Sequence, residues 1–194
     1  MGFGRKSAVL FSDRLELRLP KRADYVPWVT TRREGVEFLQ KWEPIRGRDY
    51  DSRSSFYHRV SWAVRAEKAQ SAMPFMIIRR NDQRLIGALT LDGIQFGPAK
   101  NGRVGYWIGP EFARQGYMSE ALTLVVNYAF RDLDLSRIEA ACLPENQASR
   151  GVLEKCGFKY EGVAQSYLQI NGRWRTHVRY AHLRRDRRGQ SDAE

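Results

Sequence analysis

Glycine, arginine and small polar residues follow a short apolar strand in the middle of the chain, an order of residue types suited to binding an anion. The segment reads Gly-Tyr-Trp-Ile-Gly-Pro-Glu-Phe-Ala-Arg-Gln-Gly-Tyr-Met-Ser-Glu-Ala over residues 105–121. We expect the strand to end at Ile108 and a helix to begin near Ser119, whose free N–H groups and dipole would attract negative charge. Gly116 would let the backbone approach a phosphate closely, and Arg114 could add a charge-assisted contact.

A second strand end leads into a helix at residues 143–150, which read Leu-Pro-Glu-Asn-Gln-Ala-Ser-Arg. Asn146 is a good N-cap residue, and Ser149 follows three positions later. This spacing predicts a capped helix, and capping is compatible with a ligand contact. The glycine loop before it is neither a Walker sequence nor a G-x-G-x-x-G run, which argues against nucleoside triphosphate and dinucleotide sites.

Histidine and cysteine are not spaced for a metal site or for a nucleophile beside its base. Cys142 and Cys156 are the only cysteines, too few for a disulfide framework, and this usage favours a reducing cytoplasm. We expect His58, His177 and His182 to be structural or surface residues, and we expect no metal.

Length and composition fit one domain. The chain has 194 residues, and 42% of them are hydrophobic, enough to bury a core. No repeat or linker divides the chain, so we expect a single domain over residues 11–183, with disordered ends at 1–10 and 184–194. No apolar run approaches the roughly 18 residues of a membrane helix.

Basic residues are concentrated toward the two ends. Residues 1–80 hold 17 Lys and Arg against 9 Asp and Glu, and residues 171–194 hold 7 against 3, whereas residues 81–170 hold 9 against 10. This distribution suits contact with a polyanion such as RNA, a ribosomal surface or a phosphorylated cofactor, and it equally suits a solvated surface.

The order of apolar patterns predicts an α/β domain with a mixed sheet. Strands are expected at residues 15–19, 75–79, 85–95, 104–108 and 138–143, and from residue 158 onward. Helices are expected at residues 24–33, 35–41, 54–68, 119–133 and 147–156. Gly157 would close the last helix, and Asn171-Gly172 marks a tight hairpin before the final strand.

Taken together, these segments resemble the GCN5-related N-acetyltransferase (GNAT) superfamily, and within it the ribosomal-protein-alanine N-acetyltransferases. Gly116 takes the place of the central glycine in the family's acetyl-CoA loop, usually written Q/R-x-x-G-x-G/A. Ala113 stands where Gln or Arg is usual, and Met118 stands where a small residue is usual. Asn146 and Ser149 match the Asn-x-x-Ser of the subgroup.

Three further segments carry the resemblance, which covers about residues 11–183. Residues 155–162 match the subgroup's K-x-G-F…E-G run. Residues 38–46, Phe-Leu-Gln-Lys-Trp-Glu-Pro-Ile-Arg, resemble its acceptor-side Trp-Glu-Pro loop. Residues 171–177 resemble its hairpin, although Thr176 replaces a usual Asp.

The resemblance implies a GNAT fold, a twisted mixed sheet, mostly antiparallel and flanked by helices, whose strands splay in a V at the acetyl-CoA site. It implies acetyl-CoA as co-substrate. The cofactor-binding residues that it implies are Ile108, Arg114, Gln115, Gly116, Tyr117, Met118, Ser119 and Asn146. A backbone N–H near Ile108 would stabilise the oxyanion that forms in acetyl transfer. The substrate-binding candidates are Trp42, Glu43 and Tyr106.

Ser149 and Glu43 are the candidate catalytic residues. Ser149 resembles the subgroup's proposed general acid and would stabilise the leaving thiolate by a hydrogen bond. Glu43 is a candidate base, directly or through water, or else the group that binds the cationic amine. An α-amine with a pKa of about 7.7–8 is neutral in on the order of a tenth of molecules at pH 7. Lysine, with a pKa of about 10.4, is neutral in fewer than about one in a thousand, so protein N-termini need less help from a base.

The resemblance therefore predicts a cytoplasmic, acetyl-CoA-dependent N-acetyltransferase that acts on the N-terminal α-amine of a protein, with an alanine of a ribosomal protein as the expected acceptor. One alternative is the same chemistry on a small amine such as a polyamine or aminoglycoside, which the positive charge of residues 1–80 disfavours. Another is a ribosome- or RNA-associated protein without catalysis, which intact Gly116, Asn146 and Ser149 disfavour. The acceptor, the general base and the oligomeric state stay open.

Overall fold

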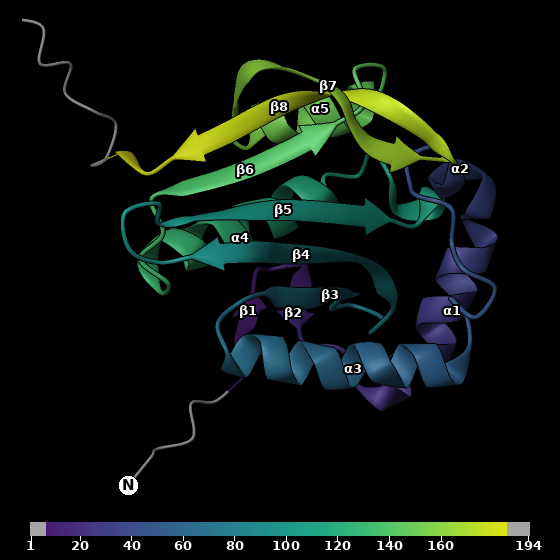
Figure 1. Cartoon of the computed structure of the whole chain (residues 1–194). Helices are drawn as coiled ribbons and strands as arrows, with labels where there is room; N and C mark the ends of the chain where they lie inside the picture. The colour runs from purple at the N-terminus through teal and green to yellow at the C-terminus, as the bar shows by residue number, and fades with distance from the viewer. Residues whose placement is uncertain (1–6, 186–194) are drawn as a thin grey trace, which may run out of the picture.

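An eight-stranded mixed sheet forms the centre of the protein (Figure 1). The structure, a computed structural model, describes residues 7–185. Its strands are β1 (Val9–Phe11), β2 (Leu15–Arg18), β3 (Met73–Arg79), β4 (Leu85–Gln95), β5 (Asn101–Ile108), β6 (Arg137–Cys142), β7 (Lys159–Ile170) and β8 (Arg173–Leu183). They lie in the order β1-β2-β3-β4-β5-β6-β8-β7 across the sheet.

Within residues 7–185, five α-helices and two short 3-10 helices connect the strands. The α-helices are α1 (Tyr25–Glu34), α2 (Val36–Gln40), α3 (Arg53–Lys68), α4 (Tyr117–Arg131) and α5 (Gln147–Lys155). The 3-10 helices are η1 (Arg22–Asp24) and η2 (Pro110–Phe112). The elements expected from the sequence are therefore confirmed, with ends shifted by a few residues. None of the helices within residues 7–185 is long and apolar enough to cross a membrane.

The sheet is mixed and mostly antiparallel, as predicted, and its parallel pair is short. Within the described residues only β5 and β6 run parallel, and they pair only from Asn101–Arg103 to Arg137–Glu139. Beyond these residues the two strands diverge, and Figure 1 shows the widening between them. The predicted V-shaped splay is thus located between β5 and β6.

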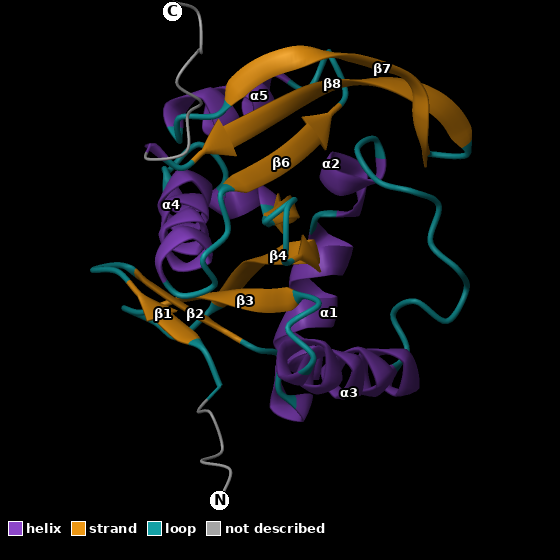
Figure 2. Cartoon of the chain, turned by 60° about the vertical axis from the view of Figure 1, so that its left-hand side comes forward, coloured by secondary structure: helices purple, strands orange, loops and turns teal. Residues whose placement is uncertain are grey.

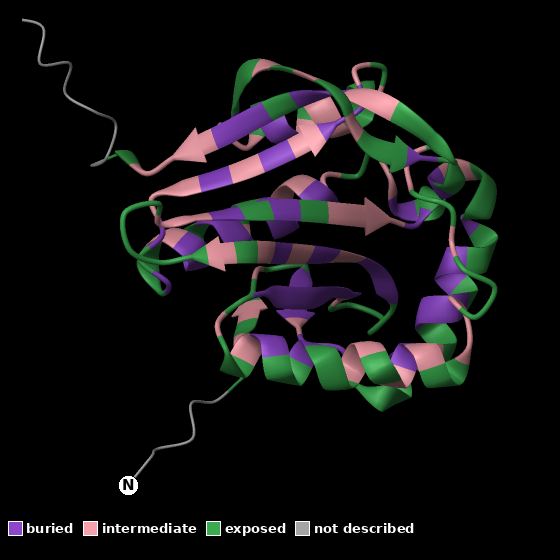
Figure 3. Ribbon diagram, in the orientation of Figure 1, coloured by how far each residue is buried: buried purple, intermediate pink, exposed green. Residues whose placement is uncertain are grey.

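Strand β3 is buried on both faces, because helices cover both sides of the sheet (Figure 2). Side chains of successive strand residues point to opposite faces. Phe75 and Ile77 accordingly join the core under α4, whereas Met76 and Ile78 join a second core with Trp28 of α1 and residues of α3. Figure 3 shows the buried residues on the central strands and on the inward sides of the helices, with α3 and β7 largely exposed.

The prediction of disordered ends is wrong for the terminal residues that the structure describes. Strand β1 pairs antiparallel with β2, and the backbone N–H of Ala8 donates to Glu67 Oε1 at 2.8 Å. Arg184 donates to the carbonyl of Phe130 at 3.0 Å and to Asp134 at 2.6 Å. Strand β2 is a near neighbour of β1, but Glu67 is 59 positions from Ala8, and Phe130 and Asp134 are 54 and 50 positions from Arg184, so local sequence patterns contain no sign of these side-chain contacts. Residues 1–6 and 186–194 lie outside the described residues.

Both predicted glycine turns are confirmed. Asn171 and Gly172 have φ values of 45° and 77°, the left-handed pair that a two-residue hairpin requires between β7 and β8. Gly157 has a φ of 84° directly after α5, which is the usual conformation past a helix end.

Candidate active site

The last residues of β5 are paired on one side only. They pair with β4, whereas no described strand forms hydrogen bonds with their backbone on the side of β6. The N–H of Gly109 donates to the carbonyl of Ile86 at 2.8 Å and so faces β4. Neighbouring N–H groups of an extended strand point in opposite directions, so the N–H of Ile108 points toward the side from which β6 has diverged. A fixed backbone donor in this position can stabilise negative charge on an oxygen atom.

Helix α4 begins beside this strand end with a row of free donors. Gly116 is its N-cap, with a left-handed φ of 81°, and the first hydrogen bond of the helix runs from the N–H of Glu120 to the carbonyl of Gly116 at 3.0 Å. The N–H groups of Tyr117, Met118 and Ser119 have no hydrogen-bond acceptor among the described residues. Such groups, together with the helix dipole, are able to bind an anion.

Side chains from the turn between β1 and β2 hold this loop in place. Ser12 Oγ donates to Glu120 Oε1 at 2.5 Å, and Arg14 Nε donates to Glu120 Oε2 at 2.7 Å. Arg14 also donates to the carbonyl of Gln115 at 3.2 Å and lies 4.5 Å from the centre of the Tyr117 ring. Burial acts to raise the pKa of Glu120, but the hydrogen bonds from Ser12 and Arg14 outweigh it and hold the pKa below its usual range. Glu120 therefore stays ionised and clamps the loop.

The predicted cofactor-binding residues of this loop differ in whether their side chains are exposed to a ligand. Arg114, with a φ of 60°, and Gln115 are exposed, and Gln115 Nε2 donates to the carbonyl of Glu111 at 2.6 Å. The side chains of Tyr117 and Met118 are buried in the core, so these residues can offer a ligand only their backbone.

Tyr106 and Ser149, predicted for different roles, lie together. The Tyr106 hydroxyl is 2.9 Å from Ser149 Oγ and 3.3 Å from the Ser149 carbonyl. Asn146 is the N-cap of α5, as predicted, and its Oδ1 accepts from the backbone N–H of Ser149 at 3.0 Å. This contact joins the start of α5 to β5 across the splay, and it leaves the Ser149 hydroxyl free of the capping role.

Burial keeps the groups around Ser149 protonated. It raises the pKa of Tyr106 well above the usual range, and the hydrogen bond with Ser149 offsets only part of this effect. It likewise raises the pKa of the Cys142 thiol, again offset in part by a hydrogen bond with Ser149, and the pKa of the Cys156 thiol. Because nucleophilic cysteines need a lowered pKa, neither thiol is suited to nucleophilic catalysis, whereas the two hydroxyls can donate hydrogen bonds.

Glu43 belongs to a different network. Arg32 Nη2 donates to Glu43 Oε2 at 2.5 Å, and Arg46 also bonds to this oxygen. Arg32 is only 1% exposed and lies 4.5 Å from the centre of the Trp107 ring, which packs against the core of α1 and α3. Tyr106 packs against the opposite core, so Glu43 is tied to the other face of β5. No hydrogen bond within the described residues joins Glu43 to Ser149.

The loop that carries Glu43 also contacts the β7–β8 turn. The backbone N–H of Asn171 donates to the carbonyl of Glu43 at 2.9 Å. Trp42, the neighbouring candidate, is half-buried, and the ammonium group of Lys41 lies 5.1 Å from the centre of its ring. The predicted acceptor-side loop and the predicted hairpin are therefore in contact.

The sequence analysis did not find Arg14 or Arg32. Arg14 belongs to no motif, and its partner Glu120 is 106 positions away. Arg32 had one weak signal, since it follows the buried Trp28 by four positions and so shares its face of the helix. A charged residue on an apolar helix face marks a buried ion pair or a ligand contact.

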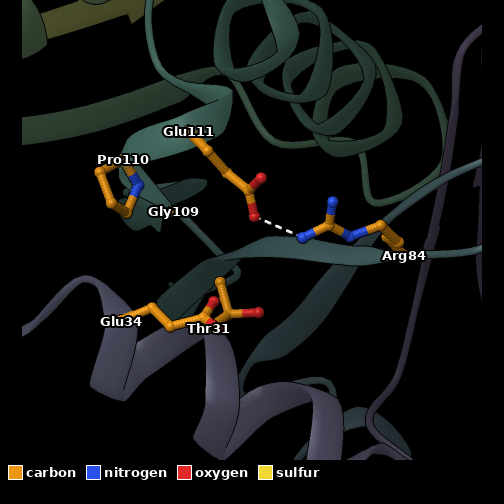
Figure 4. A pocket seen from close by; sticks show the side chains of 6 residues that line it. All are labelled: Thr31, Glu34, Arg84, Gly109, Pro110 and Glu111. Atoms are coloured by element: carbon orange, nitrogen blue, oxygen red, sulfur yellow. Dashed lines mark hydrogen bonds and ion pairs between the residues drawn. The ribbon is translucent and has the colours of Figure 1, made fainter.

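A small cavity of about 290 Å³ lies just after β5 and shares no residue with the predicted site (Figure 4). Its lining residues are Thr31, Glu34, Arg84, Gly109, Pro110 and Glu111. An ion pair between Arg84 and Glu111 crosses it, which connects the start of β4 to η2. Within residues 7–185, no group of three or more His, Cys, Asp or Glu is arranged to hold a metal ion.

Comparison with known proteins assigns the chain to a family. Residues 14–159 match the sequence profile described as Acetyltransferase (GNAT) domain. This chain belongs to the GNAT acetyltransferase family. It is an N-acetyltransferase, as the sequence analysis predicts.

Similarity to individual relatives and solved structures covers nearly the whole chain. The chain is 33% identical over 180 residues to the [Ribosomal protein uS5]-alanine N-acetyltransferase of Escherichia coli (strain K12), which covers 91% of this chain and 93% of the relative. Its fold matches the ribosomal-protein-S5-alanine acetyltransferase of Vibrio fischeri with a TM-score of 0.86 and 29% identity, over 92% of this chain and 98% of the other. It matches Mycobacterium smegmatis RimJ, solved in complex with CoA-disulfide, with a TM-score of 0.85 and 27% identity, over 95% and 90%.

The capping geometry predicts effects of different size on stability for two substitutions at the start of α5 of the GNAT enzyme. Asn146→Ala removes the side-chain cap of α5 and should lower the free energy of unfolding by about 1 kcal/mol. Ser149→Ala keeps the backbone N–H that the cap binds, and Tyr106 keeps the Ser149 carbonyl as an acceptor, so stability should change by less than about 0.5 kcal/mol. Urea unfolding of both variants measures the difference. A larger loss for Ser149→Ala would contradict the assignment of the cap to Asn146.

Proposed function

We propose that this GNAT enzyme uses acetyl-CoA to acetylate the N-terminal α-amine of a protein, with an N-terminal alanine of a ribosomal protein as the acceptor. One observation carries the proposal: the likeness to the uS5-alanine N-acetyltransferase of E. coli extends over 91% of this chain and 93% of the relative. A protein of this function would work where ribosomal proteins are made, which agrees with the cytoplasmic location expected from its cysteine usage.

The start of α4 supports acetyl-CoA as the co-substrate. The free N–H groups of Tyr117, Met118 and Ser119 would bind the pyrophosphate, with Arg114 exposed beside them. Bound acetyl-CoA would supply the acetyl group as a thioester and depart as the CoA thiol. Gly116 is needed because its φ of 81° turns the chain into the helix without a side chain over these donors.

Backbone and hydroxyl donors at the splay support the transfer itself. The N–H of Ile108 would donate to the acetyl oxygen, where negative charge develops during attack by the amine. Ser149 would donate a hydrogen bond to the departing sulfur, with Tyr106 orienting its hydroxyl. The raised pKa of Tyr106 keeps its own proton available for this purpose.

Glu43 would bind the acceptor amine as a cation. All three hydrogen bonds from Arg32 and Arg46 go to Oε2, while Oε1 accepts no hydrogen bond from the described residues. Arg32 and Arg46 therefore orient the carboxylate and leave one oxygen for an ammonium group. The general-base role is the weaker of the two, because an α-amine already has a usable neutral fraction near pH 7.

The small-amine alternative fits the acceptor side less well. Three arginines, Arg32, Arg46 and Arg59, lie around Tyr50 near Glu43. A polyamine or aminoglycoside carries several positive charges and would be repelled there. The non-catalytic alternative is set aside because the chain is an acetyltransferase by family.

Ribosome or RNA contact through the basic ends stays a proposal. Of the four arginines in the C-terminal tail, Arg187 and Arg188 lie outside the described residues. Arg184 is used within the chain, where it pairs with Asp134, and Arg185 is exposed.

Peptide acetylation tests the proposed acceptor. An unblocked ribosomal N-terminal peptide that begins with alanine should release CoA thiol, because its α-amine is partly neutral at pH 7. The same peptide with an acetylated N-terminus and an internal lysine should be inert, and spermidine should react at least tenfold more slowly in kcat/KM. Thiol release with acetyl-CoA is the measurement. Faster reaction with spermidine, or with the internal lysine, would contradict the proposal.

Gly116→Val tests the cofactor loop. Valine at a φ of 81° is strained, and the adjustment of the backbone would misplace the donors of α4, so CoA affinity should fall at least tenfold, about 1.4 kcal/mol. Gly97→Val is the matched control, since Gly97 has a φ of 74° and open space around it in the loop between β4 and β5. It should suffer similar strain and keep full affinity. Equal CoA affinities of the two folded variants, measured by calorimetry, would contradict the assignment of this loop to cofactor binding.

Ser149→Ala tests the departure of the thiol. Turnover at saturating acetyl-CoA should fall roughly tenfold or more, because the sulfur loses its hydrogen-bond donor, while CoA affinity should stay unchanged. Steady-state kinetics and CoA calorimetry on the same variant separate the two effects. Unchanged turnover would mean that Ser149 has no part in the reaction.

A further inference from the structure

Three arginine side chains surround one tyrosine in the loop between α2 and α3. The guanidinium carbons of Arg59, Arg46 and Arg32 lie 4.0, 4.9 and 5.6 Å from the centre of the Tyr50 ring. We call Arg32, Arg46 and Arg59 the arginine cluster. Glu43 is the only carboxylate that pairs with the cluster among the described residues, and it bonds to Arg32 and Arg46. Three positive charges therefore meet one negative charge.

Arg59 is the member of the cluster that no carboxylate of the described residues pairs with. Its Nε is buried without a hydrogen-bond partner, and its guanidinium forms no hydrogen bond or ion pair with any residue from 7 to 185. It is held by ring faces alone, 4.0 Å from the centre of Tyr50 and 5.3 Å from that of Trp28. These contacts fix the side chain without neutralising it. A half-buried charge left unpaired in this way is costly, and an anion from outside the chain would remove the cost.

The arginine cluster lies on the acceptor side of the site. Arg32 is 4.5 Å from the centre of the Trp107 ring, and Trp107 directly precedes Ile108 at the end of β5. Glu43, which pairs with the cluster, accepts a backbone hydrogen bond from Asn171 in the β7–β8 turn. Figure 1 shows α1, α2 and this turn on the same side of the molecule, at the end where β5 terminates.

We propose that Arg59, with Arg46 beside it, binds an anionic group on the acceptor, and that this group is the carboxylate of an Asp or Glu within its first few residues. The proposal rests on the proposed function, in which the acceptor is a protein N-terminus. Guanidinium groups recognise carboxylates by paired, charge-assisted hydrogen bonds. An extended peptide advances by about 3.3 Å per residue, so its side chains follow closely behind the reacting amine. Glu43 would bind the acceptor α-amine, and Arg59 would bind the Asp or Glu carboxylate that follows it.

Paired peptides test this specificity. Peptides that begin with alanine carry Glu at position 2, 3 or 4, and each has a partner with Gln at the same position. The wild-type enzyme should favour Glu at one or more positions by at least tenfold in kcat/KM, mainly through KM. Arg59→Gln should abolish the preference. Arg53→Gln should keep it, because Arg53 is exposed on the same helix and contacts Tyr25 outside the arginine cluster.

A charge reversal guards against loss of folding as the explanation. Arg59→Glu should prefer peptides with Lys over those with Glu at the same position, a gain that an unfolded protein cannot show. Calorimetry with the N-acetylated products measures the same preference without turnover.

The outcomes separate this proposal from the proposed function. Acetylation of Glu and Gln peptides at equal rates, or a preference that survives Arg59→Gln, overturns the carboxylate subsite and leaves the proposed function intact. Peptides that neither react nor bind overturn both.

Discussion

The parallel pairing of β5 with β6 stops after three residue pairs, and the candidate active site depends on this interruption. Each strand keeps its other neighbour, since β5 stays paired with β4 as far as Ile108 and β6 with β8 as far as Cys142. The inner edges therefore separate while both strands remain anchored. In a continuous sheet, the N–H of Ile108 would be used by the next strand. At the splay it is fixed in direction and free to bind a ligand.

Free backbone donors are useful only if the loop that carries them is rigid, and distant side chains provide that rigidity. Ser12 and Arg14 join the turn between β1 and β2 to Glu120 in the first turn of α4. The side chains of Tyr117 and Met118 anchor the same turn in the core. In the proposed site the main chain would bind the anion, while side chains hold the main chain still. Donors fixed in advance need no reorganisation when charge arrives.

Strand β5 connects two networks because successive side chains point to opposite faces. Tyr106 meets Ser149 on the face covered by α4, and Trp107 meets Arg32 on the face covered by α1 and α3. The first network contains the hydroxyl donors, and the second holds the carboxylate of Glu43. One extended strand can therefore place co-substrate chemistry and acceptor recognition on either side of the same backbone.

Sequence alone determined the features that depend on near neighbours. The α-helices, the strands other than β1, Asn146 as a cap, Gly116 as the loop glycine and the Asn171-Gly172 turn all follow from periodicity or from conformational preferences over a few positions. Resemblance added the family and the candidate site residues. Tertiary structure decided the end of the β5–β6 pairing, the pairing of β1, the contact of Tyr106 with Ser149 and the arginine networks. Several of these contacts join distant parts of the chain: Tyr106 and Ser149 are 43 positions apart, and Arg14 and Glu120 are 106 positions apart. Contacts made by long arginine side chains require no periodic pattern in the sequence, so only the packed structure reveals them.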